Sequence, residues 1–141
     1  PPRSTLFPYT TLFRSGVTDP APEAVYRSKR YSYDQAASTP LVYTLSGLGR
    51  GVDYKVRLHF CETTFTEANR QLMRLEVTGA TTETEASYDV YTAAGGAWRA
   101  VVKEFTLKAD NAGEIEVRLV PLLNSSGVYN LSLNGLEVVP T

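Results

Sequence analysis

The sequence predicts an all-β fold, a two-sheet antiparallel β-sandwich with a jelly-roll-like arrangement of strands. Apolar and polar residues alternate with period two over residues 54–62 and again over residues 113–121, which is typical of strands buried on one face. No apolar stripe with helical spacing competes with this pattern. Glycine-containing turns at 46–51, 94–96 and 109–113 separate the patterned segments, because glycine adopts positive φ at little cost.

The expected strands are short and follow one another along the chain. They cover residues 24–27, 41–45, 52–62, 70–78, 86–92, 98–108, 113–121 and 128–139. In the third of them Tyr54, Val56, Leu58 and Phe60 share one face, which we expect to point into the core. The last one is interrupted at Gly135, where the apolar register shifts by one residue. A glycine at such a shift favours a bulge.

Length and composition narrow the classes of function. A chain of 141 residues has room for one domain and buries about two-thirds of its unfolded surface, so it needs no metal or disulfide to fold. The net charge is −1 and no basic stripe is present, so nucleic acid is not expected as a partner. No run of 18 apolar residues occurs, so no membrane-spanning segment is expected.

The amino terminus differs in character from the rest of the chain. In residues 1–15 the triplet Thr-Leu-Phe occurs twice, and the segment resembles translated sequencing-adapter read-through. We therefore expect 1–15 to be a non-native tail, with a genuine first strand as the alternative. Residues 16–23 contain three prolines or glycines and are expected to form a linker or loop, which leaves 24–141 as the folded domain.

Signatures of catalysis are weak. Cys61 lies two residues from His59 on one strand face, but a nucleophile pair of this kind lacks a third, orienting group, and burial as a small apolar side chain is the simpler interpretation. The carboxylates form no pair in a catalytic context. No loop is rich enough in Asp and Asn to hold calcium, so we expect no metal and no cofactor. The sequence therefore favours binding over catalysis.

Five segments, in order, resemble the malectin domain and its bacterial relatives, the malectin-like carbohydrate-binding modules attached to glycoside hydrolases. They are residues 26–31 (Tyr-Arg-Ser-Lys-Arg-Tyr), 54–62 (Tyr-Lys-Val-Arg-Leu-His-Phe-Cys-Glu), 75–79 (Leu-Glu-Val-Thr-Gly), 89–105 and 133–138 (Leu-Asn-Gly-Leu-Glu-Val). The resemblance covers about residues 24–139. It lacks the opening strand of the family, as expected if 1–15 replaced that strand. It implies a β-sandwich with a sugar site on loops at one end.

The resemblance also implies which residues hold the sugar. A pyranose needs aromatic rings against its apolar faces and polar groups around its rim. Carried over by position, Tyr31 and Tyr26 are stacking candidates and Phe65 is what remains of an aromatic pair. Asn124 stands where the family has an aspartate. Tyr33 also lies in or beside the loops. As alternatives, Tyr26 and Tyr31 pack between strands and Phe65 plugs the end of the sandwich.

The function implied is that of a non-catalytic carbohydrate-binding module that holds an oligo- or polysaccharide. Its expected context is a larger, secreted bacterial glycoside hydrolase with a covalently linked catalytic domain. We expect it to be extracellular or periplasmic, with a signal in the missing amino-terminal part. The alternative is a structural or protein-interaction sandwich that binds no sugar. Convergence of Tyr26, Tyr31 and Phe65 on one open concavity would favour the first hypothesis, and scattered or buried rings would favour the second.

Overall fold

The computed structural model describes residues 10–141 and is built almost entirely of strands. In chain order the elements are α1 (Glu23–Arg27), β1 (Arg30–Gln35), β2 (Leu41–Leu45), β3 (Asp53–Cys61), β4 (Leu72–Thr78), β5 (Thr82–Asp89), α2 (Val90–Ala94), β6 (Ala100–Lys108), β7 (Ile115–Pro121), β8 (Tyr129–Leu133) and β9 (Gly135–Pro140). The predicted all-β sandwich is confirmed.

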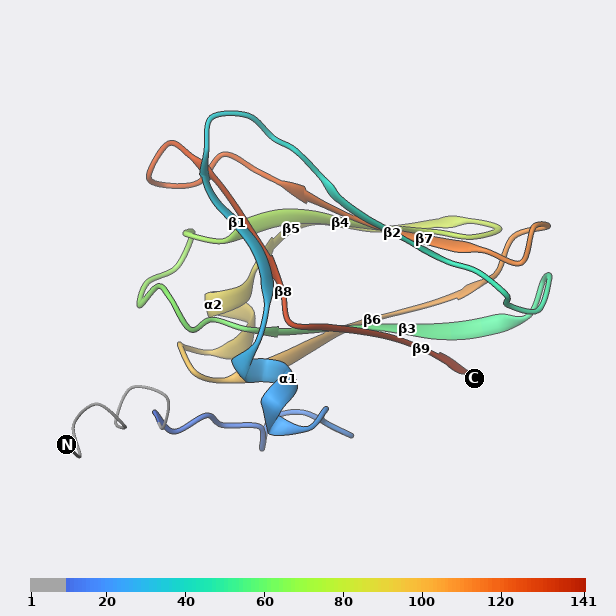
Figure 1. Ribbon diagram of the computed structural model, residues 1–141, viewed down its shortest axis with the longest axis horizontal. Helices are drawn as coiled ribbons and strands as arrows, with labels where there is room; N and C mark the ends of the chain where they lie inside the picture. Colours follow the sequence, from blue (N-terminus) through green and yellow to red (C-terminus); the bar gives the residue numbers. More distant parts are fainter. Residues whose placement is uncertain (1–9) are drawn as a thin grey trace.

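Two antiparallel sheets form the layers of the sandwich. One has the strand order β2-β7-β4-β5 and the other the order β6-β3-β9. A two-stranded sheet of β1 and β8 runs between the two layers at one end of the molecule (Figure 1). This end carries the candidate site described below.

The core fills the space between the layers. Val56, Leu58 and Phe60 of β3 are fully buried, as the alternation in the sequence predicts, and they face Met73 and Val77 of β4. Each such side chain contributes about 1.5–3 kcal/mol to folding when it leaves water. The two layers are therefore held together mainly by apolar contact.

Three expectations about secondary structure were wrong. Residues 24–27 form the single-turn helix α1 rather than a strand. The strand expected over 86–92 ends at Asp89, and the chain continues as helix α2, which Gly95 closes with a φ of 81°. Strand β1 (Arg30–Gln35) was not predicted. A period of two cannot be distinguished from one helical turn over only four or five residues.

The predicted irregularity at Gly135 is a change of sheet rather than a bulge. β8 pairs with β1, and β9, which starts one residue later, pairs with β3. Gly135 itself fits closely, since a Cβ there would lie 2.7 Å from Cγ1 of Val25 and 3.4 Å from Cβ of His59. The chain thus crosses from the end sheet into the three-stranded layer at a position where any side chain would have to displace Val25.

The amino-terminal segment packs on the outer face of the three-stranded sheet. Leu12 is buried, the N–H of Phe13 donates to the carbonyl of Trp98 (2.8 Å) and the N–H of Ala100 donates to the carbonyl of Phe13 (2.7 Å). Such pairing is what the alternative of a genuine first strand requires, although it amounts to an isolated bridge. Residues 1–9 of the expected tail lie outside the described residues. Residues 16–22 form turns and bends, and α1 begins at Glu23.

Candidate functional site

Three aromatic rings lie in a row at the end of the sandwich that β1 and β8 close. The ring centres of Tyr31 and Tyr33 are 4.8 Å apart, and those of Tyr33 and Phe65 are 5.3 Å apart. Tyr31 and Tyr33 share one face of β1 because alternate residues of a strand point the same way, and Phe65 comes from the loop after β3. Tyr31 is 60% exposed. We call these three residues the ring row.

Lys29 holds the ring row together from one side. Its Nζ donates to Oη of Tyr33 (2.8 Å) and to Oγ1 of Thr64 (2.6 Å) and Thr63 (3.2 Å). The same ammonium lies 5.4 Å from the ring centre of Tyr31 and 5.1 Å from that of Tyr33, within the range of a cation–π interaction. One cation thus fixes two rings and the loop that carries the third.

Glu62 fixes the loop from inside the protein. Its side chain is fully buried, and one carboxylate oxygen accepts the N–H groups of Thr64 and Phe65, both at 3.1 Å. The other oxygen accepts Nε2 of Gln71 at 2.7 Å. Burial raises the pKa of Glu62, although these hydrogen bonds act in the opposite direction. Glu62 therefore anchors the loop after β3 that carries Phe65.

Gln71 joins the buried carboxylate to the ring row. Its amide nitrogen is also 3.2 Å from Oη of Tyr33, and its amide oxygen accepts a hydrogen bond from the hydroxyl of Ser132 on β8. Every polar group in this network has a partner, which is the condition for a buried network to be rigid. Tyr33 is thus held from β1, β8 and the loop after β3.

Asn124 lies behind the ring row rather than on it. It is 7% exposed, and its side chain donates to the carbonyl of Arg70 (2.8 Å) and accepts the N–H groups of Ser126 (2.9 Å) and Val128 (3.2 Å). The guanidinium of Arg70 lies 4.3 Å from the ring centre of Phe65. Asn124 therefore reaches the ring row through Arg70, and its amide is engaged in holding a turn.

Tyr26 lies apart from the ring row and is fully buried. Its Oη is 2.7 Å from Nδ1 of His59 and accepts the N–H of Ala21 at 3.2 Å. Its ring belongs to a small cluster with Leu12 and Cys61, so it offers no surface on which a sugar can stack. The alternative of a packing aromatic describes this residue.

The ring row is an open surface rather than a concavity. Tyr31 lines a hollow of about 210 Å³ together with residues of β1, β2 and β8, whereas neither Tyr33 nor Phe65 lines it. The expected convergence of Tyr26, Tyr31 and Phe65 on one hollow is thus not seen. Two of the three, Tyr31 and Phe65, each contact the ring of Tyr33, which lies between them. The resemblance to the family did not select Tyr33 as a site residue.

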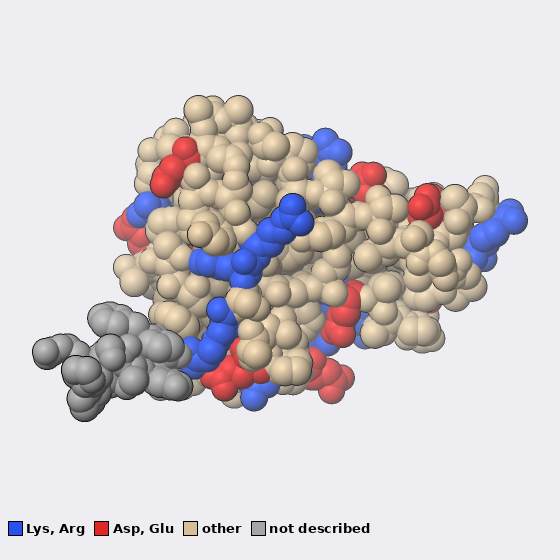
Figure 2. All heavy atoms as spheres, in the orientation of Figure 1, with Lys and Arg blue, Asp and Glu red and all other residues tan. Residues whose placement is uncertain are grey.

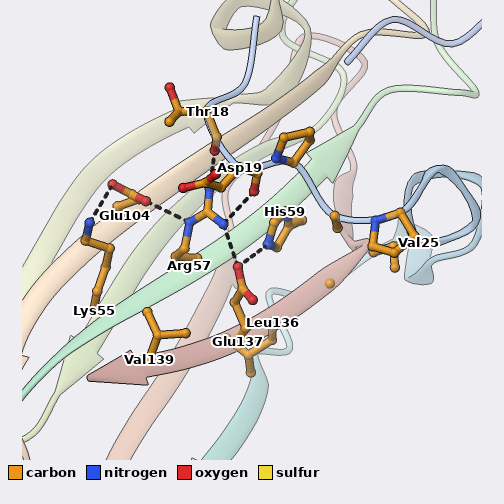
Figure 3. A pocket seen from close by; sticks show the side chains of 14 residues that line it. Thr18, Asp19, Val25, Lys55, Arg57, His59, Glu104, Leu136, Glu137 and Val139 are labelled. Atoms are coloured by element: carbon orange, nitrogen blue, oxygen red, sulfur yellow. Dashed lines mark hydrogen bonds and ion pairs between the residues drawn. The ribbon is translucent and has the colours of Figure 1, made fainter. Parts of the chain in front are cut away.

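A larger hollow lies elsewhere, on the outer face of the three-stranded sheet. It measures about 760 Å³ and lies between residues 18–25 and strands β3 and β9 (Figure 3). Arg57, on its floor, donates to the carboxylates of Glu104 (2.7 Å) and Glu137 (2.6 Å) and to the carbonyls of Thr18 (2.7 Å) and Asp19 (2.8 Å). These bonds fasten the amino-terminal loop to the sheet.

His59 completes this polar cluster. Because an ionised carboxylate only accepts hydrogen bonds, Nε2 of His59 donates to Glu137 at 3.0 Å, while Nδ1 lies 2.7 Å from Oη of Tyr26. Burial acts to raise the pKa of Glu137, but the hydrogen bonds from His59 and Arg57 outweigh it and lower that pKa. Arg57 bonds both the carboxylates of the hollow and the carbonyls of the amino-terminal loop, so we regard this cluster as a clamp on the amino-terminal segment.

We looked for a reactive nucleophile and for metal ligands near the ring row and the hollow around Arg57. Cys61 is buried, and burial raises its pKa to about 12, so the thiol stays protonated at neutral pH. Within residues 10–141, no three His, Cys, Asp or Glu side chains lie close enough to hold a metal ion. Neither α1 nor α2, the helices of the same part of the chain, is long enough to cross a membrane.

The chain is similar in sequence and in fold to several known proteins. The chain is 32% identical over 99 residues to a receptor-like protein kinase of Arabidopsis thaliana, a match that covers 63% of this chain and 11% of the kinase. Its fold is similar to that of the ANX2 ectodomain of A. thaliana, with a TM-score of 0.76 at 21% identity, covering 92% of this chain and 37% of that one.

A second solved relative is the plant receptor-like kinase FER, with a TM-score of 0.73 at 22% identity, covering 93% of this chain and 37% of that one. A further structure, of the plant peptide RALF23 in complex with FER and LLG2, gives a TM-score of 0.75 at 23% identity over 92% of this chain and 36% of that one. The chain thus spans little more than a third of these solved relatives. Residues 9–138 match the malectin domain, and the chain belongs to that family.

Proposed function

We propose that this domain is a non-catalytic carbohydrate-binding module that holds an oligo- or polysaccharide on the ring row. The observation that carries the proposal is the ring of Tyr31, 60% exposed at the end of a row whose other members are fixed by hydrogen bonds. A pyranose presents apolar C–H patches that lie well against such a ring. A rigid ring loses little conformational freedom when a sugar binds, which favours affinity.

The polar groups beside the rings suit the rim of a sugar. The hydroxyls of Thr63 and Thr64 and the ammonium of Lys29 lie at the edge of the ring row, where they can exchange hydrogen bonds with sugar hydroxyls. An open surface with few stacking rings gives weak binding. We expect dissociation constants between micromolar and millimolar, which is about −8 to −4 kcal/mol.

The test is a glycan-array screen followed by calorimetric titration of the best glycan. Replacing Tyr31 with alanine should weaken binding by about 1–3 kcal/mol, because it removes the ring against which the sugar lies. The matched control is Phe13→Ala, which removes another surface ring, 47% exposed, outside the ring row. An affinity unchanged by Tyr31→Ala would remove this residue from the site.

The alternative function is protein or peptide interaction. It is favoured by the similarity in fold to plant receptor kinases, one of which is seen with the peptide RALF23 and with LLG2. Exposed aromatic and cationic side chains suit a peptide as well as a sugar. A glycan array without any binder, together with selection from a displayed peptide library that Tyr31→Ala abolishes, would establish this alternative.

As part of the proposal, the domain belongs to a longer extracellular protein. The relatives it resembles in fold include ectodomains, and the chain spans only part of each. Our sequence-based hypothesis names a bacterial glycoside hydrolase as the parent, in which the module would hold the catalytic domain near its polymer. In that case, the glycan bound by the module should be the polymer that the linked catalytic domain cleaves.

A further inference from the structure

The side chain of Glu62 is fully buried, and every group bonded to it in the described part of the chain is a hydrogen-bond donor. Two of the donors are the backbone N–H groups of Thr64 and Phe65, and the third is the side-chain amide of Gln71. An ionised carboxylate only accepts hydrogen bonds, whereas a protonated one carries an O–H that itself needs an acceptor. The surroundings of Glu62 as they stand therefore fit the anion.

The depth of the site nevertheless disfavours the anion. Burial raises the pKa of Glu62 and outweighs the hydrogen bonds and the attraction of Lys29, which act to lower that pKa. Two other titratable groups lie nearby. Tyr33 is joined to Glu62 through Gln71, and the neighbouring thiol of Cys61 stays protonated at neutral pH. Glu62 thus takes up a proton at a pH above the ordinary glutamate pKa of about 4.3.

A proton on Glu62 can be accommodated at Oε1. Oε2 accepts two backbone N–H groups, whereas Oε1 faces the side-chain amide of Gln71, which can turn over. After a half-turn the amide oxygen of Gln71 would accept the new O–H, and its nitrogen would donate to Oγ of Ser132, which now donates to that oxygen. The buried groups have partners in both arrangements, as a network with two states requires.

Tyr33 carries the change to the ring row. Its Oη accepts hydrogen bonds from Nζ of Lys29 (2.8 Å) and from the amide of Gln71 (3.2 Å), so its own proton points away from both and is available to a ligand. Once Gln71 turns over, an amide oxygen faces Tyr33 and the phenolic proton turns inward. The loop after β3 then donates to a neutral oxygen of Glu62, a weaker acceptor than a carboxylate.

Lys29 loses a nearby negative charge in the same step. Its Nζ is bonded to hydroxyl groups, which carry no charge. Figure 2 shows basic side chains across the middle of the face that β1 crosses in Figure 1, with acidic ones towards its margins. Protonation of Glu62 therefore removes a charge that attracts Lys29, the cation that lies over two rings of the ring row.

We infer that Glu62 is a positioning residue that makes the ring row sensitive to pH: the ionised carboxylate holds the rings and leaves the proton of Tyr33 to a saccharide, and uptake of one proton withdraws both. The inference rests on the proposed function and names how that site is regulated. A ligand that prefers the ionised form competes with protons, so binding weakens as the medium becomes acidic.

The first experiment uses the protein without ligand. NMR spectra between pH 8 and pH 4 follow the backbone amide protons of Thr64 and Phe65 and the side-chain amide of Gln71. We expect the three signals to shift with one common midpoint above the ordinary glutamate pKa of about 4.3, because one proton changes all three hydrogen bonds.

Variants assign this midpoint to Glu62. Glu62→Gln should abolish the common shifts, because its amide resembles the protonated acid and cannot titrate. The matched control is Glu67→Gln, which removes a carboxylate that is 64% exposed on the same loop and should leave the midpoint unchanged. The wild-type spectra decide the matter by themselves should Glu62→Gln fail to fold.

The second experiment measures binding. A printed glycan array is read at several protein concentrations at pH 7.5 and at pH 4.5. Wild type and Glu67→Gln should bind about threefold to tenfold more weakly at pH 4.5, the effect of losing about one hydrogen bond. Glu62→Gln should bind with the weaker affinity at both pH values. Thermal unfolding of each protein at both pH values verifies that it is folded.

The outcomes separate the inference from the proposed function. Absence of a common midpoint, or a midpoint that survives in Glu62→Gln, overturns the inference. Equal affinities at the two pH values for a glycan that wild type binds also overturn it, while saccharide binding stands. An array without any binder at either pH overturns the proposed function, and a common midpoint in the spectra then still supports the role of Glu62 in positioning the ring row.

Discussion

Lys29 is the residue on which the geometry of the ring row depends most directly. It bonds three hydroxyl groups and lies over two rings, and so joins β1 to the loop after β3. Removing it leaves Oη of Tyr33 bonded to Gln71 alone.

We therefore expect Lys29→Met to lower the free energy of unfolding by about 1–2 kcal/mol, because three charge-assisted hydrogen bonds are lost at a partly exposed position. Glycan affinity should fall as the rings lose their fixed spacing. Chemical denaturation and calorimetric titration measure the two effects. Lys55→Met is the matched control, since Lys55 is 3.9 Å from its nearest carboxylate oxygen. Equal behaviour of the two variants would contradict the role given to Lys29.

Glu137 makes the free energy of unfolding of the domain depend on pH. Its pKa in the folded protein lies below the ordinary value of a glutamate, about 4.3, owing to hydrogen bonds from His59 and Arg57 that outweigh partial burial. A group with a lowered pKa stabilises the folded state above its unfolded pKa, and that stabilisation is lost as the pH falls through the folded pKa.

The expected result is that wild type loses more stability between pH 6 and pH 3 than Glu137→Gln does. The amide keeps the size of the side chain but cannot titrate. Unfolding by urea at a series of pH values measures the difference, in which the opposite contribution of Glu62 cancels because both proteins retain it. Parallel pH profiles for the two proteins would show that Glu137 contributes nothing to the acid sensitivity.

The sequence predicted two members of the ring row and missed what organises them. Tyr31 and Phe65 were carried over from the family by position, and the structure brings them within one ring of each other. Tyr26 occupies a comparable place in the sequence but points inward, because α1 turns its side chain onto His59. A local pattern does not reveal the direction of a side chain on a single helical turn, and the contacts of Lys29 join residues 34 and 35 positions apart.

At the scale of elements, strands with at least five alternating residues and a glycine turn beside them were predicted correctly. The expected 41–45, 52–62 and 113–121 correspond to β2, β3 and β7. The failures are α1, α2 and β1. In β1 the two aromatic residues, Tyr31 and Tyr33, form part of the ring row instead of the core. Its apolar pattern therefore does not mark a core face.

The junction of β8 and β9 depends on the absence of a side chain at Gly135. We expect Gly135→Ala to destabilise the domain by about 1–3 kcal/mol, because the new methyl group would displace Val25 and with it α1. Gly79→Ala should cost more, since its Cβ would lie 2.1 Å from the backbone carbonyl oxygen of Lys108. Gly16→Ala, which meets nothing within 4 Å, is the control. Unfolding midpoints that fail to follow this order would contradict the packing described for the junction.

At the scale of the molecule, the ring row stands on the two-stranded sheet of β1 and β8, which connects the two layers. β1 and β8 are short, but β8 is continuous in sequence with β9 of the three-stranded layer, and Leu131 and Leu133 of β8 are buried in the common core. The architecture could be predicted from the alternation of residues, because burial on one face dictates that pattern in every sandwich. The closing sheet could not, because it arises from pairing between residues about a hundred positions apart.

The crossing at Asn134 and Gly135 has a mechanical consequence. Strand β8 passes directly into β9, and the side chain of Asn134 bonds the backbone of Tyr26, Ser28 and Cys61, so the end sheet is tied to the three-stranded layer at this point. We therefore expect a ligand to meet a surface whose shape is largely set before it binds, which favours ligands that already match it.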